Sequence, residues 1–431
     1  MKVQLNEAQP TVIITGPPWP RGGAARVMQS QIRFYRERGY NTVFIADPLG
    51  CIFTRNSPVW DEFRDGLNEL GADSTLLAAV EPRRFKLAKY ATTMRHGLRG
   101  TALDWRVAIG GSAQLTADAE SLLKNCRIAL FHVNHVYTLG FALRLKREFV
   151  VRKNHVPLIV DTHDIQSHAL EAEPENNPWT RRPDTVGRLL QSEVAQLSQS
   201  NVLIHLSLSD FNFFQKELSS KAHFLALPTI DEGFISSVKA SEPSTEPIDL
   251  LLVAHRHHAN LSAIKWFFEQ VWPLIAICKF SLKIVGSVNR IVEAEMPQLY
   301  EKFREYFVGE VVDLAPFYRA ARCAIAPMVS GTGISIKTIE AFALGKAFVG
   351  TSNAFRGMPM ARLEQMKIYA HDQPRAFADA ILSSMNDLKS AEQSSQAAYD
   401  SLFSSEACFR VRDEALAAAY QQQGSEERVL R

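Results

Sequence analysis

Cysteine is scarce in this sequence and follows no motif. The 431 residues include five cysteines at widely scattered positions: Cys51, Cys126, Cys278, Cys323 and Cys408. Secreted disulfide frameworks and zinc sites need cysteines in pairs or at close spacings such as Cys-x-x-Cys. Neither kind of site is predicted here. We expect reduced thiols, as in a protein of the cytoplasm.

Long hydrophobic runs are also missing. No stretch approaches the about 18 consecutive apolar residues of a transmembrane helix, and residues 1–10 lack the charged start and apolar run of a signal peptide. The net charge is only +2, which is too small to predict nucleic-acid binding by the whole chain. With 46% hydrophobic and 22% charged residues, the composition predicts a globular protein of two sizeable domains.

One local stretch departs from this charge balance. Residues 83–99 carry six basic side chains of Lys and Arg and no acidic one, while Leu87, Ala91, Met94 and Leu98 recur at helical spacing. Such a pattern is typical of a helix that lies on an anionic membrane with its apolar stripe toward the lipid. A surface helix whose stripe faces the core has the same pattern. The first of these two interpretations predicts peripheral contact with the inner face of the cell membrane.

Two common ligand-binding motifs are absent. The first loop, Gly16–Gly23, contains three prolines where dinucleotide-binding enzymes have Gly-x-Gly-x-x-Gly. Asp47, at the end of the second strand, suggests a nicotinamide dehydrogenase, but this is therefore the weaker alternative. Binding of NAD by the purified protein would support it. No Asp-x-Asp pair is present for a bridging divalent metal. The adjacent residues His255–His258 cannot easily converge on one ion, so no metal and no cofactor are expected.

Apolar strands alternate with amphipathic helices along most of the chain. In the first part, strands are predicted at 11–15, 42–46, 128–133, 158–161, 202–206 and 224–227, and a helix at 24–38. The serine- and proline-rich stretch 236–247 lacks a sustained apolar period and is interpreted as a linker. The predicted layout is a first domain 1–235, a linker 236–247, a second domain 248–395 and a helical tail 396–431.

The most informative segment is a glycine-bracketed loop after the predicted strand 323–327. Gly331 and Gly333 let backbone N–H groups approach an anion, and the helix that starts near Ile334 directs its unpaired N–H groups the same way. Lys337 and Glu340 are three residues apart and share one face of that helix. Phosphate at Lys337 and ribose hydroxyls at Glu340 would suit a nucleotide. The structural alternative is a plain turn followed by a solvated Lys–Glu pair.

The segment Leu250–Pro359 resembles the donor domain of the family 4 (group 1) glycosyltransferases. The similarity rests on an ordered set of residues: Leu251–Asn260, Val308–Leu314, Tyr318, Pro327, Gly331-Thr332-Gly333, Lys337, Glu340-Ala341, Gly345-Lys346 and Thr351–Met358. Members of this family are retaining enzymes of the GT-B fold that use nucleotide-sugar donors. The resemblance implies an α/β protein with two Rossmann-like domains facing each other across a cleft. It also implies a terminal helix that packs back on the first domain.

The resemblance assigns roles in the second domain. Arg256, whose planar guanidinium suits phosphate oxygens, is predicted to bind the diphosphate. The loop residues Gly331, Thr332, Gly333 and Ile334 are predicted to bind the donor with it. Lys337 and Glu340 are predicted to act directly in the reaction.

In the first domain, Gly22 and Gly23 open the helix at 24–38 and match the family's glycine loop near the diphosphate. A helix-start turn without function is the structural alternative. His163 follows the predicted strand 158–161 and looks like the family histidine that contacts the transferred sugar, so it is the third predicted catalytic residue. His132 and His135 are second choices.

Two positions depart from the family pattern. Thr332 stands where the family often carries a glutamate, eight residues before Glu340, and Ala354 stands where glycine is usual. The resemblance implies metal-independent transfer of a sugar to a glycan or lipid-linked acceptor, with bacterial surface-polysaccharide synthesis as the working hypothesis. A non-catalytic partner or scaffold with the same fold is the alternative, and Thr332 is its best argument.

Overall fold

The computed structural model describes the chain except for residues 1–4, 7, 20–22, 48–64, 80–86, 88–89, 92–93, 95–112, 151–155, 172–184, 244–245, 332 and 430–431. The chain forms two compact units. Unit 1 comprises Met1–Ala226 and Phe409–Arg431, and unit 2 comprises Leu227–Cys408. Of the predicted site residues, Gly22 and Thr332 lie outside the described residues.

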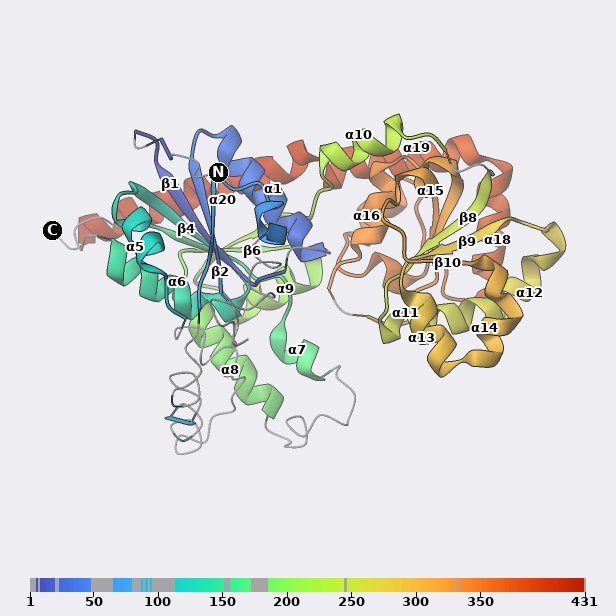
Figure 1. Ribbon diagram of the computed structural model, residues 1–431, viewed down its shortest axis with the longest axis horizontal. Helices are drawn as coiled ribbons and strands as arrows, with labels where there is room; N and C mark the ends of the chain where they lie inside the picture. Colours follow the sequence, from blue (N-terminus) through green and yellow to red (C-terminus); the bar gives the residue numbers. More distant parts are fainter. Residues whose placement is uncertain are drawn as a thin grey trace. The chain divides into compact units, whose positions relative to one another are not determined.

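Unit 1 contains, among the described residues, a parallel sheet of seven strands in the order β3-β2-β1-β4-β5-β6-β7 (Figure 1). The strands are β1 (Thr11–Gly16), β2 (Asn41–Ala46), β3 (Ser74–Leu77), β4 (Ile128–Asn134), β5 (Leu158–Asp161), β6 (Val202–His205) and β7 (Ala222–Leu225). Every residue of β1 and β2 is buried, as expected of strands with helices on both faces. Each strand predicted for the first domain overlaps one of these, and β3 is the strand that the sequence did not predict.

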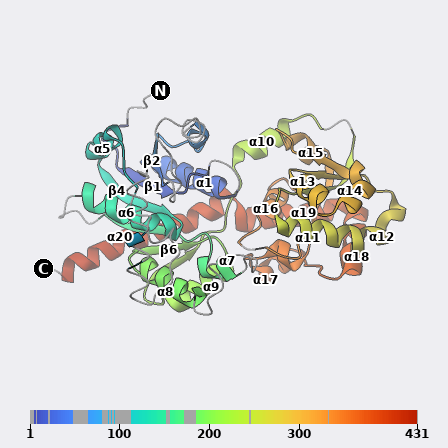
Figure 2. The same cartoon turned by 60° about the horizontal axis from the view of Figure 1, so that its bottom comes forward.

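The helices of unit 1 flank this sheet. They are α1 (Gly23–Glu37), α5 (Ala117–Lys124), α6 (Val136–Phe149), α7 (Gln166–Glu171), α8 (Thr185–Leu197) and α9 (Leu208–Glu217). The terminal helix α20 (Ser405–Val429) belongs to unit 1 from Phe409 onward (Figure 2). The ring of Phe409 packs edge-on against Phe34 of α1 at 5.4 Å between centroids, and Asp413 pairs with Arg38 at 2.6 Å.

Unit 2 contains a parallel sheet whose five described strands run in the order β10-β9-β8-β11-β12. The strands are β8 (Ile248–Val253), β9 (Leu282–Val285), β10 (Phe307–Gly309), β11 (Ala321–Ala326) and β12 (Ala347–Gly350). In both units the strand order reverses beside the first strand, at β1/β4 and at β8/β11. The predicted fold class, with two Rossmann-like α/β domains, is confirmed.

The helices of unit 2 cover both faces of the smaller sheet. They are α10 (Glu232–Ala240), α11 (His258–Trp266), α12 (Trp272–Ile275), α13 (Val288–Glu295), α14 (Pro297–Phe303), α15 (Ala315–Ala320), α16 (Ile336–Ala343), α17 (Met360–Gln365), α18 (Pro374–Asn386) and α19 (Leu388–Ala398). Phe267–Val271 and Tyr399–Phe403 form π-helical turns, and three short 3-10 turns span Ala276–Cys278, Arg304–Tyr306 and Ser352–Phe355.

The border between the units differs from the predicted one. The chain enters unit 2 after Ala226, before residue 235, and α10 occupies the first part of the predicted linker 236–247. Asp231 caps α10 by accepting a hydrogen bond from the N–H group of Phe234 at 2.9 Å. Val238 packs with Ile248 in a core cluster of unit 2. A capped helix therefore forms in a segment whose serine content suggested a linker.

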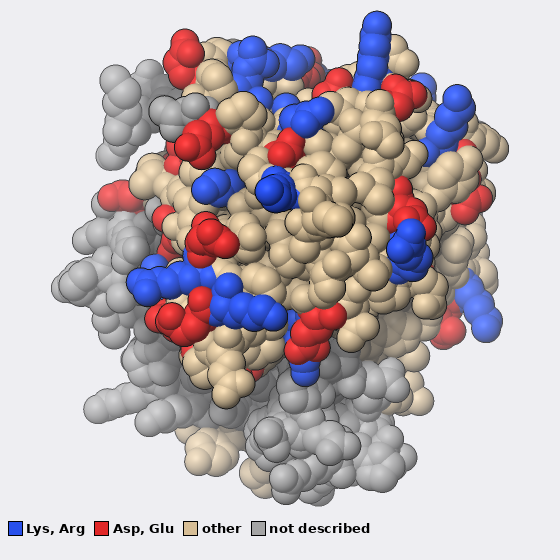
Figure 3. All heavy atoms as spheres, turned by 90° about the vertical axis from the view of Figure 1, so that its right-hand side faces the viewer, with Lys and Arg blue, Asp and Glu red and all other residues tan. Residues whose placement is uncertain are grey.

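One helical stretch in the described part of the chain, His258–Cys278, is long and apolar enough to cross a membrane by length and composition, with a mean hydropathy of 1.2. Its residues Ile264, Phe267, Val271 and Ile275 are buried in the main core cluster of unit 2. It therefore serves as a core helix of unit 2. Among the described residues on the face in Figure 3, basic and acidic side chains are intermingled, in keeping with the low net charge.

Candidate active site

The carboxyl ends of β8 and β11 lie side by side where the strand order of the unit 2 sheet reverses. β8 leads to β9 and β10 on one side, whereas β11 leads to β12 on the other. Open parallel sheets bind ligands at such switch points, in the loops after the strands. Arg256 follows β8, and Gly331 and Gly333 follow β11. The described donor-binding residues predicted for unit 2 therefore gather at one edge of one sheet.

Two glycines in the loop after β11 have positive φ angles. The angle is +136° at Gly331 and +66° at Gly333, in a region that other residues rarely adopt. A Cβ atom on Gly331 would lie 3.3 Å from Cζ of Arg356. The loop therefore needs glycine for its conformation and, at Gly331, for the close approach of the guanidinium.

Helix α16 begins at Ile336 and not at Ile334, which lies in the preceding loop. Ser335 is the N-cap residue, and its side chain accepts a hydrogen bond from Oγ1 of Thr338 at 3.0 Å instead of capping the backbone. Among the described residues, no side chain caps this helix start. Its first N–H groups and its positive dipole end remain available to an anion.

Lys337 extends from the first turn of α16 toward α11. Its Nζ atom donates to Oδ1 of Asn260 at 2.8 Å and contacts the sulfur of Met328 at 3.6 Å. Asn260 is itself oriented, because its Nδ2 donates to the carbonyl oxygen of His255 at 2.8 Å. Burial, with a smaller effect of Arg356, lowers the pKa of Lys337 to about 8. The ammonium group is thus held in place and poorly hydrated, which favours a charged ligand.

Glu340 lies one turn further along α16 and is 6% exposed. Its Oε2 atom accepts a hydrogen bond from the hydroxyl of Tyr318 at 3.1 Å. Tyr318 belongs to α15 and is buried as well. Lys337 and Glu340 therefore share a helix but have different neighbours, and Tyr318 orients the carboxylate.

Two neighbouring loops complete this edge of the sheet. The N–H group of Arg256 donates to Oγ of Ser287 at 3.1 Å, while the side chain of Arg256 is exposed. Gly286, just after β9, has a φ of +120°, and a Cβ atom there would lie 2.2 Å from the carbonyl oxygen of Ala254. The loops after β8 and β9 are therefore in direct contact.

Sequence reasoning assigned no site role to Arg356 or Asn260. Arg356 packs on Gly331 and donates to the carbonyl oxygen of Asn353 at 2.8 Å, so it adds a second cation beside the glycine loop. The signal that could have found it is its place in the Thr351–Met358 segment, which closes the family pattern. Asn260 could have been found from the same pattern, as the polar residue at a helix start.

In unit 1, His163 follows β5 and is 7% exposed. Its Nε2 atom lies 2.8 Å from Oδ1 of Asn134, and its ring stacks on that of His135. Burial lowers the pKa of His163 to about 4, so the ring is neutral at pH 7. His135, at the start of α6, also meets the ring of Trp19 edge-on at 5.0 Å.

The other predicted residues of unit 1 have different positions. Gly23 is the first residue of α1 and lies near the carboxyl end of β1, at the switch point of the larger sheet. His132, one of the second choices, is fully buried within β4, where its Nδ1 atom is hydrogen-bonded to the hydroxyl of Tyr35 and its Nε2 atom lies 3.1 Å from Oδ1 of Asp161. Its contacts make it part of a buried polar cluster.

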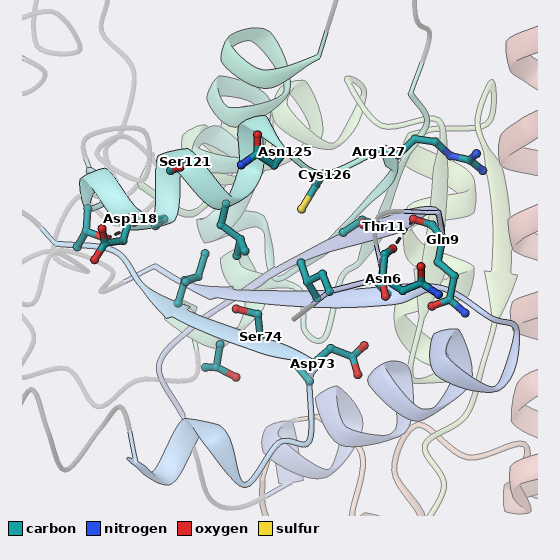
Figure 4. A pocket seen from close by; sticks show the side chains of 18 of the residues that line it. Asn6, Gln9, Thr11, Asp73, Ser74, Asp118, Ser121, Asn125, Cys126 and Arg127 are labelled. Atoms are coloured by element: carbon teal, nitrogen blue, oxygen red, sulfur yellow. Dashed lines mark hydrogen bonds between the residues drawn. The ribbon is translucent and has the colours of Figure 1, made fainter. Parts of the chain in front are cut away.

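A groove described in unit 1 lies elsewhere. It measures about 1020 Å³ and is lined by Asn6, Gln9, Asp73 and Ser74 at one side and by α5 at the other (Figure 4). These residues lie at the amino ends of β1 to β4, opposite the loops that hold His135 and His163. Among the described residues, no group of three or more His, Cys, Asp or Glu side chains is placed to hold a metal ion.

Comparison with known proteins relates the chain to a family and a fold. Residues 248–387 match the family model for glycosyl transferases group 1. No curated protein sequence matches the chain. Among solved structures, HepE of Anabaena in complex with UDP is 12% identical, with a TM-score of 0.59 over 95% of this chain and 100% of that one.

Two further structures have a similar fold. A trehalose 6-phosphate synthase of Burkholderia multivorans is 12% identical, with a TM-score of 0.58 over 97% of this chain and 100% of that one. A glycosyltransferase of Rickettsia africae is 11% identical, with a TM-score of 0.54 over 94% of this chain and 97% of that one. These similarities extend over both units, and the family match covers the sheet with the glycine loop. The chain therefore has the GT-B fold, and its residues 248–387 match the group 1 glycosyltransferase family.

Proposed function

We propose that this protein is a retaining glycosyltransferase that moves a sugar from a nucleotide-sugar donor to a glycan or lipid-linked acceptor. The observation that carries the proposal is the group of phosphate-binding features at the β8/β11 switch point. The glycine loop, the uncapped start of α16 and the ammonium group of Lys337 each favour an anion. HepE, which shares the fold, has been crystallised with UDP and with UDP-glucose, and this supports a nucleotide donor.

The reaction breaks the bond between the anomeric carbon and the diphosphate oxygen, which leaves negative charge on the departing phosphate. Fixed donors aimed at that charge lower the barrier. A helix start contributes only about 0.3 to 2 kcal/mol, so Lys337, Arg256 and Arg356 have to act with it. These cations would supply the positive charge that a metal ion supplies elsewhere. We therefore propose that no metal is required.

Retention of the anomeric configuration places the acceptor on the same side as the departing diphosphate. The acceptor hydroxyl forms the new bond to the anomeric carbon and gives its proton to a departing phosphate oxygen. No side-chain nucleophile is needed in this scheme. Glu340, oriented by Tyr318, would accept hydrogen bonds from the ribose hydroxyls. His163 would contact the transferred sugar.

The donor assignment can be tested by thermal unfolding with a panel of nucleotide-sugars. We expect one class of nucleotide to stabilise the wild-type protein, and Lys337→Ala and Glu340→Ala to lose most of that shift. The control is Lys302→Ala, because Lys302 is an exposed lysine at the end of α14. If Lys337→Ala and Glu340→Ala retain the full shift, the donor site has been assigned to the wrong residues.

A non-catalytic GT-B partner or scaffold is the second candidate. It is favoured by Thr332, which replaces the glutamate that the family often carries. Release of free sugar or a glycosylated product from a nucleotide-sugar would exclude this candidate. Binding of the nucleotide without any turnover of the donor would support it.

We further propose that residues 83–99 contact an anionic membrane, which would place the protein at the inner face of the cell membrane in surface-polysaccharide synthesis. The described residues Leu87, Tyr90 and Met94 are helical, lie at a spacing that puts them on one face, and are 70%, 73% and 68% exposed. An apolar face flanked by basic residues matches a lipid surface better than a protein core. Most of the remaining segment lies outside the described residues.

Flotation with lipid vesicles tests this contact. The protein should float with anionic vesicles and far less with zwitterionic ones, and replacing Leu87, Tyr90 and Met94 with serine should abolish the effect. The matched control is Ile277→Ser, which removes an exposed apolar side chain of unit 2. Equal flotation of the triple variant and the control would contradict the proposed membrane contact.

A further inference from the structure

A buried ion pair ties the terminal helix to the end of β5. Arg412 of α20 is 3% exposed, and its Nη2 atom lies 2.8 Å from Oδ2 of Asp161, which is fully buried. His132 lies on the other side of the carboxylate, with Nε2 3.1 Å from Oδ1. Burial alone would raise the pKa of Asp161, but Arg412 and His132 outweigh it and hold the pKa well below its usual range. Asp161 is therefore an ionised carboxylate that only accepts hydrogen bonds.

This acceptor fixes the orientation of the amide of Gln31. Nε2 of Gln31 donates to Oδ2 of Asp161 at 2.6 Å and to Oδ1 of Asn134 at 2.8 Å. With both protons of Nε2 used, Oε1 of Gln31 accepts from Nδ2 of Asn134 at 2.9 Å. A reversed amide would place the Gln31 oxygen against the carboxylate, which is unfavourable while Asp161 is charged.

The orientation of Asn134 follows in turn. Its Nδ2 atom also donates to the carbonyl oxygen of Thr15 at 3.3 Å, so its Oδ1 atom faces Nε2 of His163 at 2.8 Å. An amide oxygen only accepts, and Nε2 of His163 must therefore carry the proton. In the neutral ring, Nδ1 is then the remaining hydrogen-bond acceptor.

We propose that Arg412 is a positioning residue that acts through Asp161, Gln31 and Asn134. We call these three residues the relay. They keep His163 in the Nε2–H tautomer, with Nδ1 as an acceptor for a hydroxyl group of a polyhydroxylated ligand. The identity of that ligand as the transferred sugar rests on the proposed function, whereas the tautomer does not.

In this arrangement the terminal helix has a second role. α20 not only packs on unit 1 but also supplies the permanent positive charge that keeps Asp161 ionised and the relay oriented. Arg38, just after α1, forms another ion pair with Asp413 of the same helix, on the surface. The two pairs allow attachment of the helix to be separated from the positioning of His163.

The tautomer can be measured directly by nitrogen NMR of protein labelled at histidine, with His163→Gln to assign the signal. In the wild type we expect the Nε2 signal of a protonated nitrogen and the Nδ1 signal of an unprotonated one. Arg412→Gln should give a mixture of tautomers, Arg412→Lys should restore much of the wild-type spectrum, and Arg38→Gln should leave it unchanged. A wild-type spectrum with the proton on Nδ1 would overturn the proposal.

Kinetics supply the second readout. We expect Arg412→Gln to lower kcat roughly tenfold, as loss of an outer residue that orients a functional histidine commonly does, with little change in KM. Binding of UDP measured by calorimetry should be unaffected, because Lys337 and the glycine loop are in unit 2. Unchanged kcat together with an unchanged His163 spectrum in a folded Arg412→Gln protein would refute the positioning role.

A second variant covers the case in which Arg412→Gln does not fold. Gln31→Met interrupts the relay but leaves the pair between Arg412 and Asp161 intact, and it should give the same two effects. If it leaves both readouts unchanged, the proposal is refuted. If the spectra respond as expected but no sugar transfer is found with any donor, the positioning relationship holds and the proposed function fails.

Discussion

The imidazole rings of His135 and His163 stack with their centroids 4.0 Å apart and their planes 17° from parallel. His135 comes directly after β4, and His163 comes shortly after the neighbouring strand β5. Both have positive φ angles, +65° and +60°. Such angles in a residue other than glycine destabilise a protein by about 1 to 3 kcal/mol each and persist mainly at functional sites. The strain at this sheet edge therefore supports the candidate site.

Replacing His135 tests whether its backbone is strained. With φ +65° and ψ +144°, His135 occupies a region that is nearly restricted to glycine. We expect His135→Gly to be more stable than His135→Ala by about 1 to 3 kcal/mol, because only glycine relieves the strain. Urea denaturation of the two variants measures the difference.

The control for this test is His132, which lies inside strand β4. In a strand of ordinary geometry, glycine is less stable than alanine by about 0.5 to 1 kcal/mol. His132→Gly should therefore be less stable than His132→Ala. The same order at both positions would show that His135 is not strained.

The pKa of Lys337 predicts a basic limit for nucleotide binding. Burial lowers this pKa to about 8. The ammonium group is therefore lost from the ligand-free protein as the pH rises through 8, and affinity for a nucleoside diphosphate should fall by up to about tenfold per pH unit above that point. Calorimetric titration with UDP between pH 7 and 9.5 measures this dependence.

Lys337→Arg is the matched variant for this prediction. The guanidinium group stays charged throughout this range, so the loss of affinity above pH 8 should disappear even if the overall affinity is lower. A loss of affinity that persists unchanged in Lys337→Arg would assign the basic limit to another group.

Most of the fold was predictable because parallel strands covered on both faces form continuous apolar runs. Strands β1 and β11 were recognised in this way. β3 was missed because it begins with the polar residues Ser74 and Thr75, and only one of its four residues is buried. α10 was missed because serines on its exposed face suggested a linker.

The site was predictable where it depends on local sequence. One short segment contains Gly331, Gly333, Lys337 and Glu340, and the order of these residues matches the family pattern. The partners that orient them are distant in the chain, because Asn260 is 77 residues from Lys337. The pair between Arg412 and Asp161 spans 251 residues, and no local pattern could indicate it.

A buried carboxylate at the start of α7 predicts how stability depends on pH. Glu193 of α8 accepts hydrogen bonds from the N–H groups of Gln166 at 3.0 Å and Ser167 at 3.3 Å, at the start of α7. Burial raises the pKa of Glu193 from 4.5 to about 7. The unfolded chain therefore loses its proton first, and the contribution of Glu193 to the free energy of unfolding falls as the pH rises from 4.5 to 7.

Glu193→Gln removes this titration. The stability of the wild type relative to the variant should decrease by up to about 3 kcal/mol between pH 4.5 and 7 and stay level above pH 7. Urea denaturation of both proteins at four pH values measures the difference. Asp210, whose pKa is raised by burial to about 7, titrates in both proteins, and its effect largely cancels. A difference that is constant over this range would contradict the prediction.

Gly331→Ala tests whether the loop after β11 binds the phosphate groups. Gly331 combines a φ of +136° with a guanidinium carbon 3.3 Å from the position of an added Cβ, whereas Gly39 has a φ of +76° and no atom within 4 Å of that position. Both substitutions strain the backbone and should lower stability by about 1 kcal/mol. Only Gly331→Ala should also reduce UDP affinity, because it would displace Arg356 and the loop N–H groups that we propose bind the diphosphate. Normal affinity in Gly331→Ala, measured by calorimetry beside Gly39→Ala, would mean that the nucleotide binds elsewhere.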